Sequence, residues 1–437
     1  FDVGGNSLLA ARIIGRAAET FGVDLTVRDL FDAPTVRGLA AVVGNKAPGL
    51  PPIEAIDPRP VHVPISLAQQ RIWFLNRLDP TSSVYNIPVG LRLTGHPDPA
   101  ALRAALVDVV TRHEVLRTVF GATDGVPEQQ ITPAVDASDT LDWALVDDAA
   151  SIHRAATTGF DLTTEHPIRV RLWRSGDETI LMIVLHHIAA DGESLRPLAA
   201  DLLTAYSARA DEHAPDWAPL AVQVADVAIW QRRMLGSDDD PDSPLGRQMR
   251  YWEHELTDLP DVLELPSDRP RPPVATQRGG RIDFRVPAEI ARRVSTLAAE
   301  HSASPFMVTH AALAVLLSRL AATEDIAIGT PIAGRGQQVL DPMIGMFVNT
   351  LVLRTPVSAS TTFRDFVDQV RTTDLTALDN ADLPFESVVD RINPTRSAAF
   401  APLAQVWLTF DRSAVAELAG TDMVNDAADG VRVEVLE

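Results

Sequence analysis

Two adjacent histidines, an aspartate and a glycine occur together in HHIAADG at 186–192, directly after the apolar run TILMIVL. Such a run is typical of a strand covered on both faces, and the leucine spacing after Gly192 predicts a helix. The end of a strand, followed by a turn and a helix start, is a common position for chemistry. Two imidazoles beside a carboxylate indicate either a base or a metal site.

Strand geometry separates the two histidines. Successive side chains of a strand point to opposite faces, so His186 and His187 cannot both face one ligand while the chain stays extended. His187 shares its alternation with Ala189 and Asp191 if the strand continues that far, so we predict that His187 is the working side chain and His186 a packing residue. No third nitrogen ligand lies at a useful spacing, and we therefore expect no metal.

Asp191 and Gly192 each have a structural and a functional interpretation. Asp191 is predicted to act structurally, as the N-cap of the helix that follows or as the buried partner of an arginine, rather than directly in catalysis. Gly192 would let a substrate approach the backbone, where its N–H could bind a developing oxyanion.

Composition limits the classes of protein to consider. The chain has 437 residues, of which 46% are hydrophobic, enough for two or three domains with filled cores. Its 38 Lys and Arg against 59 Asp and Glu give a formal charge of −21, which argues against a nucleic-acid partner. There is no apolar run of the roughly 18 to 20 residues that a membrane span needs and no signal-like amino terminus, so we expect a cytoplasmic protein without a membrane partner. There is no cysteine, so any thiol chemistry must use the sulfur of a cofactor or substrate.

Periodicity divides the chain into a small helical part and a longer part in which strands and helices alternate. Helices are expected near 9–21 and at 35–43, followed by a proline-rich linker. Further helices are expected at 100–113, after Gly192, and at 288–299, 305–320 and 363–378; strands are expected at 89–93, 115–120, 168–173, 179–188, 326–328 and 350–354. The alternation occurs on both sides of the acidic stretch at 236–242, which predicts two similarly built α/β lobes.

The amino terminus reads FDVGGNSL, with Ser7 opening the first helix after two glycines. A serine N-cap alone would explain this pattern. A hydroxyl in this position is also unhindered and close to the positive backbone N–H groups of a helix start, which suits a phosphodiester. The segment resembles the modification site of peptidyl carrier proteins in nonribosomal peptide synthetases, which implies that Ser7 carries 4′-phosphopantetheine.

The rest of the chain resembles the condensation domain of the same assembly lines, through stretches that follow one another in the family's order. They are SLAQQRIWFL at 66–75, RHEVLRT at 112–118, HHIAADG at 186–192, YW at 251–252 with Leu256, IGTP at 328–331 with Gly334 and Arg335, IGMFVNT at 344–350, and LPFE at 383–386 with Arg396, Pro402 and Gln405. The form HHxxxDG also occurs alone in related acyltransferases, whereas the ordered set is strongly specific. Both domains are expected to be truncated, and Glu193 stands where the family often has an aromatic residue.

The resemblance implies a small α-helical carrier domain at 1–44, a linker at 45–62, and an α/β condensation domain. The latter would consist of two chloramphenicol-acetyltransferase-like lobes in a V, at 63–232 and 233–437. The implied reaction is peptide-bond formation, in which the amine of an acceptor aminoacyl thioester on a separate carrier attacks a donor aminoacyl or peptidyl thioester on Ser7. A downstream acceptor carrier and neighbouring adenylation domains are the implied partners.

Within this reaction, His187 is expected to accept a proton from the amine or to hold the reacting groups in place. The resemblance implies that Asp191 pairs with an arginine, for which we select Arg335. Asn349 is expected either to contact the substrate or pantetheine or to form ordinary hydrogen bonds.

Two alternatives to condensation stay open. An epimerisation domain also follows a carrier and has an HHxxxDG motif, although the stretch at 66–75 favours condensation. A catalytically silent module of the same fold, which recruits a partner enzyme, is the second alternative. The intact His187 and Asp191 argue against silence.

Overall fold

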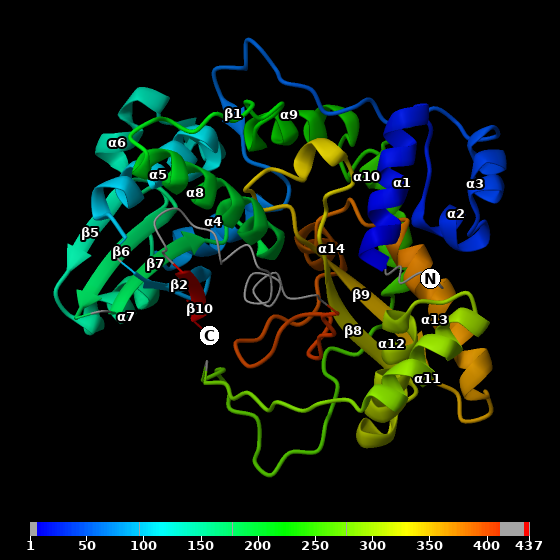
Figure 1. Cartoon of the computed structure of the whole chain (residues 1–437). Coiled ribbons are helices and arrows are strands. Elements are labelled where there is room, and N and C mark those ends of the chain that lie inside the picture. The colour runs from blue at the N-terminus through cyan, green and yellow to red at the C-terminus, as the bar shows by residue number, and fades with distance from the viewer. Residues whose placement is uncertain (1–6, 96, 177, 277, 411–431, 437) are drawn as a thin grey trace. The chain divides into compact units, whose positions relative to one another are not determined.

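The computed structural model describes residues 7–95, 97–176, 178–276, 278–410 and 432–436. The first six residues of the serine motif, including both glycines, lie outside the described residues. By their contacts the residues form two compact units, whose elements are labelled in Figure 1. We call them the histidine unit (53–233, 339–347 and the last strand) and the helical unit (up to residue 52, with 234–338 and 348–410).

The histidine unit is built on a five-stranded sheet with the order β10-β2-β7-β6-β5. Its strands are β2 (Asn86–Thr94), β5 (Asp142–Val146), β6 (Ile168–Ser175), β7 (Glu178–His186) and β10 (Arg432–Leu436). The apolar run forms β7, which is central and antiparallel to both β2 and β6. The strands predicted at 168–173 and 179–188 are therefore present as the adjacent antiparallel strands β6 and β7.

Helices of the histidine unit pack on this sheet and on one another. They are α4 (Gln69–Leu78), α5 (Pro99–Arg112), α6 (Ala137–Thr140), α7 (Ala149–Thr157), α8 (Leu195–Ala210) and α9 (Val224–Met234). Helix α5 packs along α8, and α7 contacts β2, β6 and β7. A second sheet has the order β1-β4-β3, from β1 (Val63–Pro64), β3 (Thr118–Thr123) and β4 (Val126–Ile131).

The strand predicted at 115–120 is wrong in its first half. Residues Glu114–Arg117 form a 3-10 helix, and β3 begins only at Thr118. The hydroxyl of Thr118 donates to the carbonyl of Glu114, and both Val115 and Leu116 are buried within the turn. Val115 and Leu116 are apolar because they are buried in the core, and a short apolar run is equally compatible with a strand and with a helical turn. The sequence alone therefore did not distinguish the two.

The helical unit starts with α1 (Ser7–Phe21), α2 (Val27–Asp32) and α3 (Val36–Val43). The helices predicted near 9–21 and at 35–43 are confirmed, and Gly22 ends α1 with a φ of 64°. Helix α2 was not predicted, because it is only six residues long; its start is stabilised by a capping box between Thr26 and Asp29.

The remainder of the helical unit surrounds a two-stranded antiparallel sheet, so the described sheets of the two units differ in size. Its elements are α10 (Pro244–Glu255), α11 (Ala288–Glu300), α12 (Pro305–Ala321), β8 (Asp325–Ile332), β9 (Asn349–Pro356), α13 (Phe363–Leu378) and α14 (Phe385–Ile392). No single described helix is long and apolar enough to cross a membrane; α11 and α12 meet that criterion only together, and they are bent by 106° at their junction.

The linker at 45–62 has no regular helix or strand, yet it is held at both ends. Near its start, Pro48 forms a bridge with Val23, and the N–H of Gly49 donates to Gly22. Near its end, the Arg59 guanidinium binds both carboxylate oxygens of buried Asp226, at 2.8 and 3.0 Å. Residues up to Pro52 belong to the helical unit and residues from Ile53 belong to the histidine unit. The linker is therefore anchored in each of the two units.

The assignment of all residues after 232 to one lobe needs a correction. The segment at 339–347 belongs to the histidine unit, and β10 pairs with β2 in its sheet. Strand β2 would otherwise leave one row of backbone groups unpaired at the sheet edge, which β10 satisfies. The boundaries at 44, 62 and 232 stay predictions.

Candidate functional site

The turn that carries the motif starts where β7 ends, at His186. The N–H of His187 donates to the carbonyl of Tyr85, at 2.8 Å, and the N–H of Ala189 donates back to His186. Because the strand stops at His186, the alternation assumed from His187 to Asp191 does not exist. The roles of the two histidines therefore depend on burial and hydrogen bonding instead.

His186 has a structural role, because its side chain is buried and hydrogen-bonded within the protein. It is 1% exposed, its Nδ1 accepts the N–H of Ile188 at 3.2 Å, and its ring lies edge-on to Phe160, with 5.8 Å between the centroids. Burial, with a smaller effect of the adjacent His187, lowers the pKa of His186 to about 3. The ring is therefore neutral near pH 7 and packs as predicted.

This burial predicts a pH-dependent stability. The pKa of His186 is lowered on folding, so the unfolded chain binds a proton more readily, and stability decreases as the pH falls below about 6.5. Between pH 7.5 and 5 the free energy of unfolding should fall by about 2 kcal/mol through this residue. His186→Asn keeps an acceptor for Ile188 but cannot bind the proton, and it should weaken that decrease in urea unfolding at the two pH values.

The exposed His153 provides the matched control. His153→Asn should leave the pH dependence unchanged. An equal decrease for the wild type and His186→Asn would contradict the assignment of His186 as a buried neutral residue.

His187 differs from its neighbour. Its side chain is half-buried, and its Nδ1 is buried with no hydrogen-bond partner among the described residues. Buried polar atoms without partners are rare in folded proteins and often indicate a functional role. In this motif, His187 is thus the imidazole with a nitrogen that the fold does not use.

Asp191 is 2% exposed and organises the end of the turn. Its Oδ1 accepts the N–H and the hydroxyl of Ser194, at 2.9 and 2.7 Å, as the N-cap of the 3-10 helix η3 (Gly192–Ser194) that leads into α8. Its Oδ2 accepts the N–H of Phe347, at 3.0 Å. The predicted N-cap is confirmed, while the pairing with Arg335, a residue of the helical unit, stays a prediction.

The segment at 339–347 is clamped to the motif by side chains. The Ser194 hydroxyl accepts the N–H of Gly345 at 3.1 Å, and His113 Nδ1 accepts that of Ile344 at 3.3 Å. A Cβ on Gly345 would lie 2.6 Å from the Phe347 ring, so the close packing requires glycine. The role of Ser194 was missed, although a serine three residues after a capping aspartate is a capping-box signal.

Gln69, from the stretch at 66–75, was also missed. It is fully buried, and its Nε2 donates to the carbonyl of Ile188 at 2.9 Å, which holds the turn from the side of α4. The signal available in the sequence was a glutamine three residues after Ser66, which is the spacing of a capping box.

Gly192 and Asn349 have different surroundings. Gly192 is exposed, and a Cβ built on it would meet no atom of the described residues within 4 Å, so its backbone is open to approach. In the helical unit, the Asn349 amide donates to the carbonyls of Ala381 and Leu383, and its oxygen accepts the N–H of Phe385. Asn349 thus makes ordinary hydrogen bonds, and a contact with the substrate or pantetheine stays a prediction.

Ser7 is the first residue of α1, a helix of 15 residues. The first N–H groups of such a helix lack partners within it and favour a phosphate, so this position fits the attachment of 4′-phosphopantetheine. Across the described ranges, no three His, Asp or Glu side chains gather in a way that could hold a metal.

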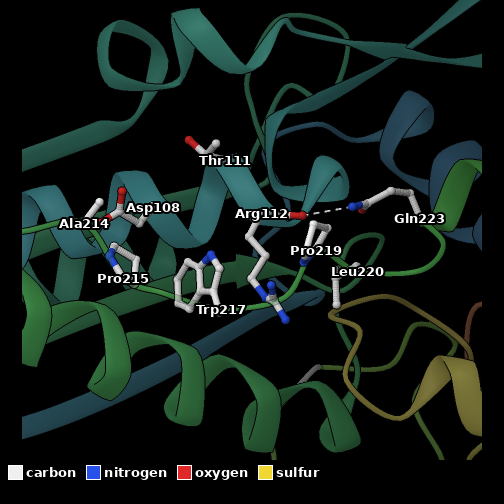
Figure 2. A pocket seen from close by; sticks show the side chains of 9 residues that line it. All are labelled: Asp108, Thr111, Arg112, Ala214, Pro215, Trp217, Pro219, Leu220 and Gln223. Carbon is white, nitrogen blue, oxygen red and sulfur yellow. Dashed lines mark hydrogen bonds between the residues drawn. The ribbon is translucent and has the colours of Figure 1, made fainter.

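A groove of about 450 Å³ lies elsewhere in the histidine unit, between α5 and the segment at 214–223 (Figure 2). The Arg112 guanidinium lies 4.9 Å from the Trp217 ring centroid and pairs with Asp201, while Gln223 donates to the Arg112 carbonyl. No residue of HHIAADG lines this groove, whereas Arg112 of the stretch at 112–118 does. It is therefore separate from the turn that carries His187.

Comparison with known families agrees with this arrangement. A model of the condensation domain matches residues 61–435, and a model of the phosphopantetheine attachment site matches residues 1–43. The chain is 45% identical to a dimodular nonribosomal peptide synthase of Bacillus subtilis (strain 168), over 97% of this chain and 18% of that protein. It is also 45% identical to an isonitrile lipopeptide synthase of Mycobacterium tuberculosis (strain H37Rv), over 94% of this chain and 17% of that protein. The chain thus spans less than a fifth of the length of these relatives.

Solved structures confirm the predicted fold class. The X-domain in its complex with OxyB from teicoplanin biosynthesis is similar, with a TM-score of 0.78 and 33% identity over 90% of this chain and 84% of that chain. The first condensation domain of the CDA synthetase has a TM-score of 0.64 over 86% of this chain and 87% of that chain. Its 20% identity shows a common fold alone.

Proposed function

The chain belongs to the condensation-domain family of nonribosomal peptide synthetases, and from this premise we propose that it forms a peptide bond. The donor is an aminoacyl or peptidyl group on Ser7, and the nucleophile is the amine of an acceptor aminoacyl group on a separate carrier. When bound, 4′-phosphopantetheine supplies the thioester that carries the donor. Adenylation domains and an acceptor carrier are the proposed partners, and the cytoplasm is the proposed location.

The proposal is carried by one observation on the two histidines. The fold uses His186, which is neutral and hydrogen-bonded, whereas His187 keeps a buried Nδ1 without a partner among the described residues. An α-amine titrates at about 7.7 to 8.0, so part of it is already neutral near pH 7 and a strong base is unnecessary. We assign His187 to hold the attacking amine and to accept its proton as the new bond forms.

The neighbouring residues position this imidazole. Gln69 holds the carbonyl of Ile188, and Asp191 with Ser194 fixes the end of the turn. The backbone N–H of Gly192, an exposed residue, is assigned to stabilise negative charge on the donor carbonyl oxygen.

A reaction assay tests the proposal directly. Ser7 is loaded with an aminoacyl pantetheine, a separately loaded acceptor carrier is added, and intact mass follows the dipeptide. A dipeptide on the acceptor is the expected result. Inversion of the donor without transfer, detected by chiral analysis of the released amino acid because the mass does not change, would establish an epimerisation domain instead.

A second candidate function is recruitment of a partner enzyme. The similarity to the X-domain that was solved with OxyB favours it specifically. It predicts no dipeptide from loaded carriers and a stable complex with a separate partner enzyme. The same mass assay separates the two functions.

Gly192→Ala is expected to lower the condensation rate by about 10²-fold, because a methyl group would obstruct the approach to a charge-stabilising N–H. The fold should stay intact, since the Cβ would enter open space. The rate is measured by intact mass and the stability by thermal unfolding. A normal rate with normal stability would exclude a role for this backbone in the reaction.

A further inference from the structure

The helices at the amino terminus share a hydrophobic core with the second half of the helical unit. Ala10 of α1 and Phe31 of α2, each 3% exposed, belong to the same cluster as Met307 of α12 and Val370 of α13. Helices α2 and α13 are in contact, as Figure 1 shows. The carrier is therefore seated on a face formed chiefly by α13.

Two ion pairs of opposite polarity connect α2 to α13. Arg28 binds Asp379 at 2.9 Å and the Thr376 hydroxyl at 2.7 Å, while Asp32 binds Arg371 at 2.7 Å. The first residue of α2 in this set, Arg28, pairs with the later residue, Asp379. The second, Asp32, pairs with the earlier residue, Arg371, so the two segments run antiparallel. A reversal of either segment would bring like charges together.

Helix α1 also contacts the second half of the helical unit, at the segment 336–338. The carboxylate of Glu19 accepts the N–H of Gln338 at 2.7 Å. A Cβ on Gly15 would lie 2.1 Å from the carbonyl oxygen of Gly336, so α1 approaches this backbone as closely as only glycine permits. The Arg371 guanidinium lies 5.8 Å from the Phe31 ring centroid, which links the apolar and charged parts of the face.

We propose that α13, together with the segment at 336–338, forms a selective docking face for the chain's own carrier. Phe31 supplies the apolar anchor. The order of charges, basic Arg28 followed one turn later by acidic Asp32, is what the face recognises. A carrier with the reverse order places like charges against Arg371 and Asp379 and is rejected. This docking goes beyond the proposed reaction and does not depend on it.

Cross-linking in the whole chain tests the docking face. The chain has no cysteine, so Glu19→Cys and Gln338→Cys, both exposed positions, introduce the only thiols, and a short bis-maleimide reports how often they meet. Arg28→Glu and Asp379→Arg should each slow the intramolecular cross-link by about fivefold, since each replaces an attraction by a repulsion. The double variant, with the charges exchanged, should restore the rate.

Two controls make the result decisive. Arg293→Glu breaks an exposed ion pair with Glu289 on α11, away from the docking face, and should leave the rate unchanged. The same ratios are expected in a His187→Ala chain, which separates docking from the reaction. Unchanged cross-linking in both single variants, or a double variant no faster than the singles, would overturn the proposal. Thermal unfolding of each variant shows that the fold is retained.

Discussion

His187→Ala is expected to lower the rate of peptide-bond formation by about 10²- to 10⁴-fold, the usual contribution of a positioned acid or base. The physical reason is a ring nitrogen that the fold does not use. His187 is half-buried, and its Nδ1 has no hydrogen-bond partner among the residues that the structure describes, while every other polar side chain described for the turn is engaged by the fold. The rate of dipeptide formation, with both carriers fully loaded, is the measurement.

The structure of the variant should be unchanged, because the backbone N–H of His187, which binds Tyr85, is kept. His153→Ala, an exposed position, serves as the control for the loss of an imidazole. Near-normal condensation by His187→Ala would exclude both proton transfer and positioning by this residue. It would also leave recruitment of a partner enzyme as the better function.

Asp191→Ala should destabilise the histidine unit by roughly 2 to 5 kcal/mol, as expected when a buried charged acceptor is removed from its donors. The substitution removes one acceptor from the N–H of Phe347 and one from the N–H and hydroxyl of Ser194, at a site that is 2% exposed. Urea unfolding at pH 7 measures the loss.

Asp216→Ala, at an exposed aspartate, is the matched control and should change stability by less than about 0.5 kcal/mol. Condensation by Asp191→Ala should fall along with stability, because the clamp on 339–347 is released. A variant that kept wild-type stability but lost activity would show that Asp191 acts on the substrate instead of on the turn.

Elements with strong local signals were predicted well. Helix α13 has the predicted bounds, and its start has a clear cap, since the Thr362 hydroxyl accepts the N–H of Asp365. Helix α12 likewise starts after Ser304, with proline in its first turn. Short elements such as α2 and the 3-10 turn at Glu114–Arg117 were missed, because too few residues repeat there to define a period.

In the candidate site, too, the local features were predicted from the sequence and the features that depend on tertiary contacts were not. The histidines, the aspartate and the glycine are contiguous in the chain, and their family resemblance rests on residue types that need no structure to be recognised. Which of the two imidazoles is available was inferred from strand alternation, and that reason was wrong even though the preference for His187 is retained as a proposal. The strand ends at His186, so burial and the Ile188 contact make the distinction.

The sequence by itself determined the family, the fold class, and the position of the motif between a buried strand and a helix, because these depend on local composition and on the order of motifs along the chain. Only the tertiary structure decided how the motif is held. Asp191 and Ser194 bind the backbone of Gly345 and Phe347, about 150 residues away, and Arg28 meets Asp379 across a still longer separation. Such contacts follow from how packed elements bring distant residues together, which no local pattern records.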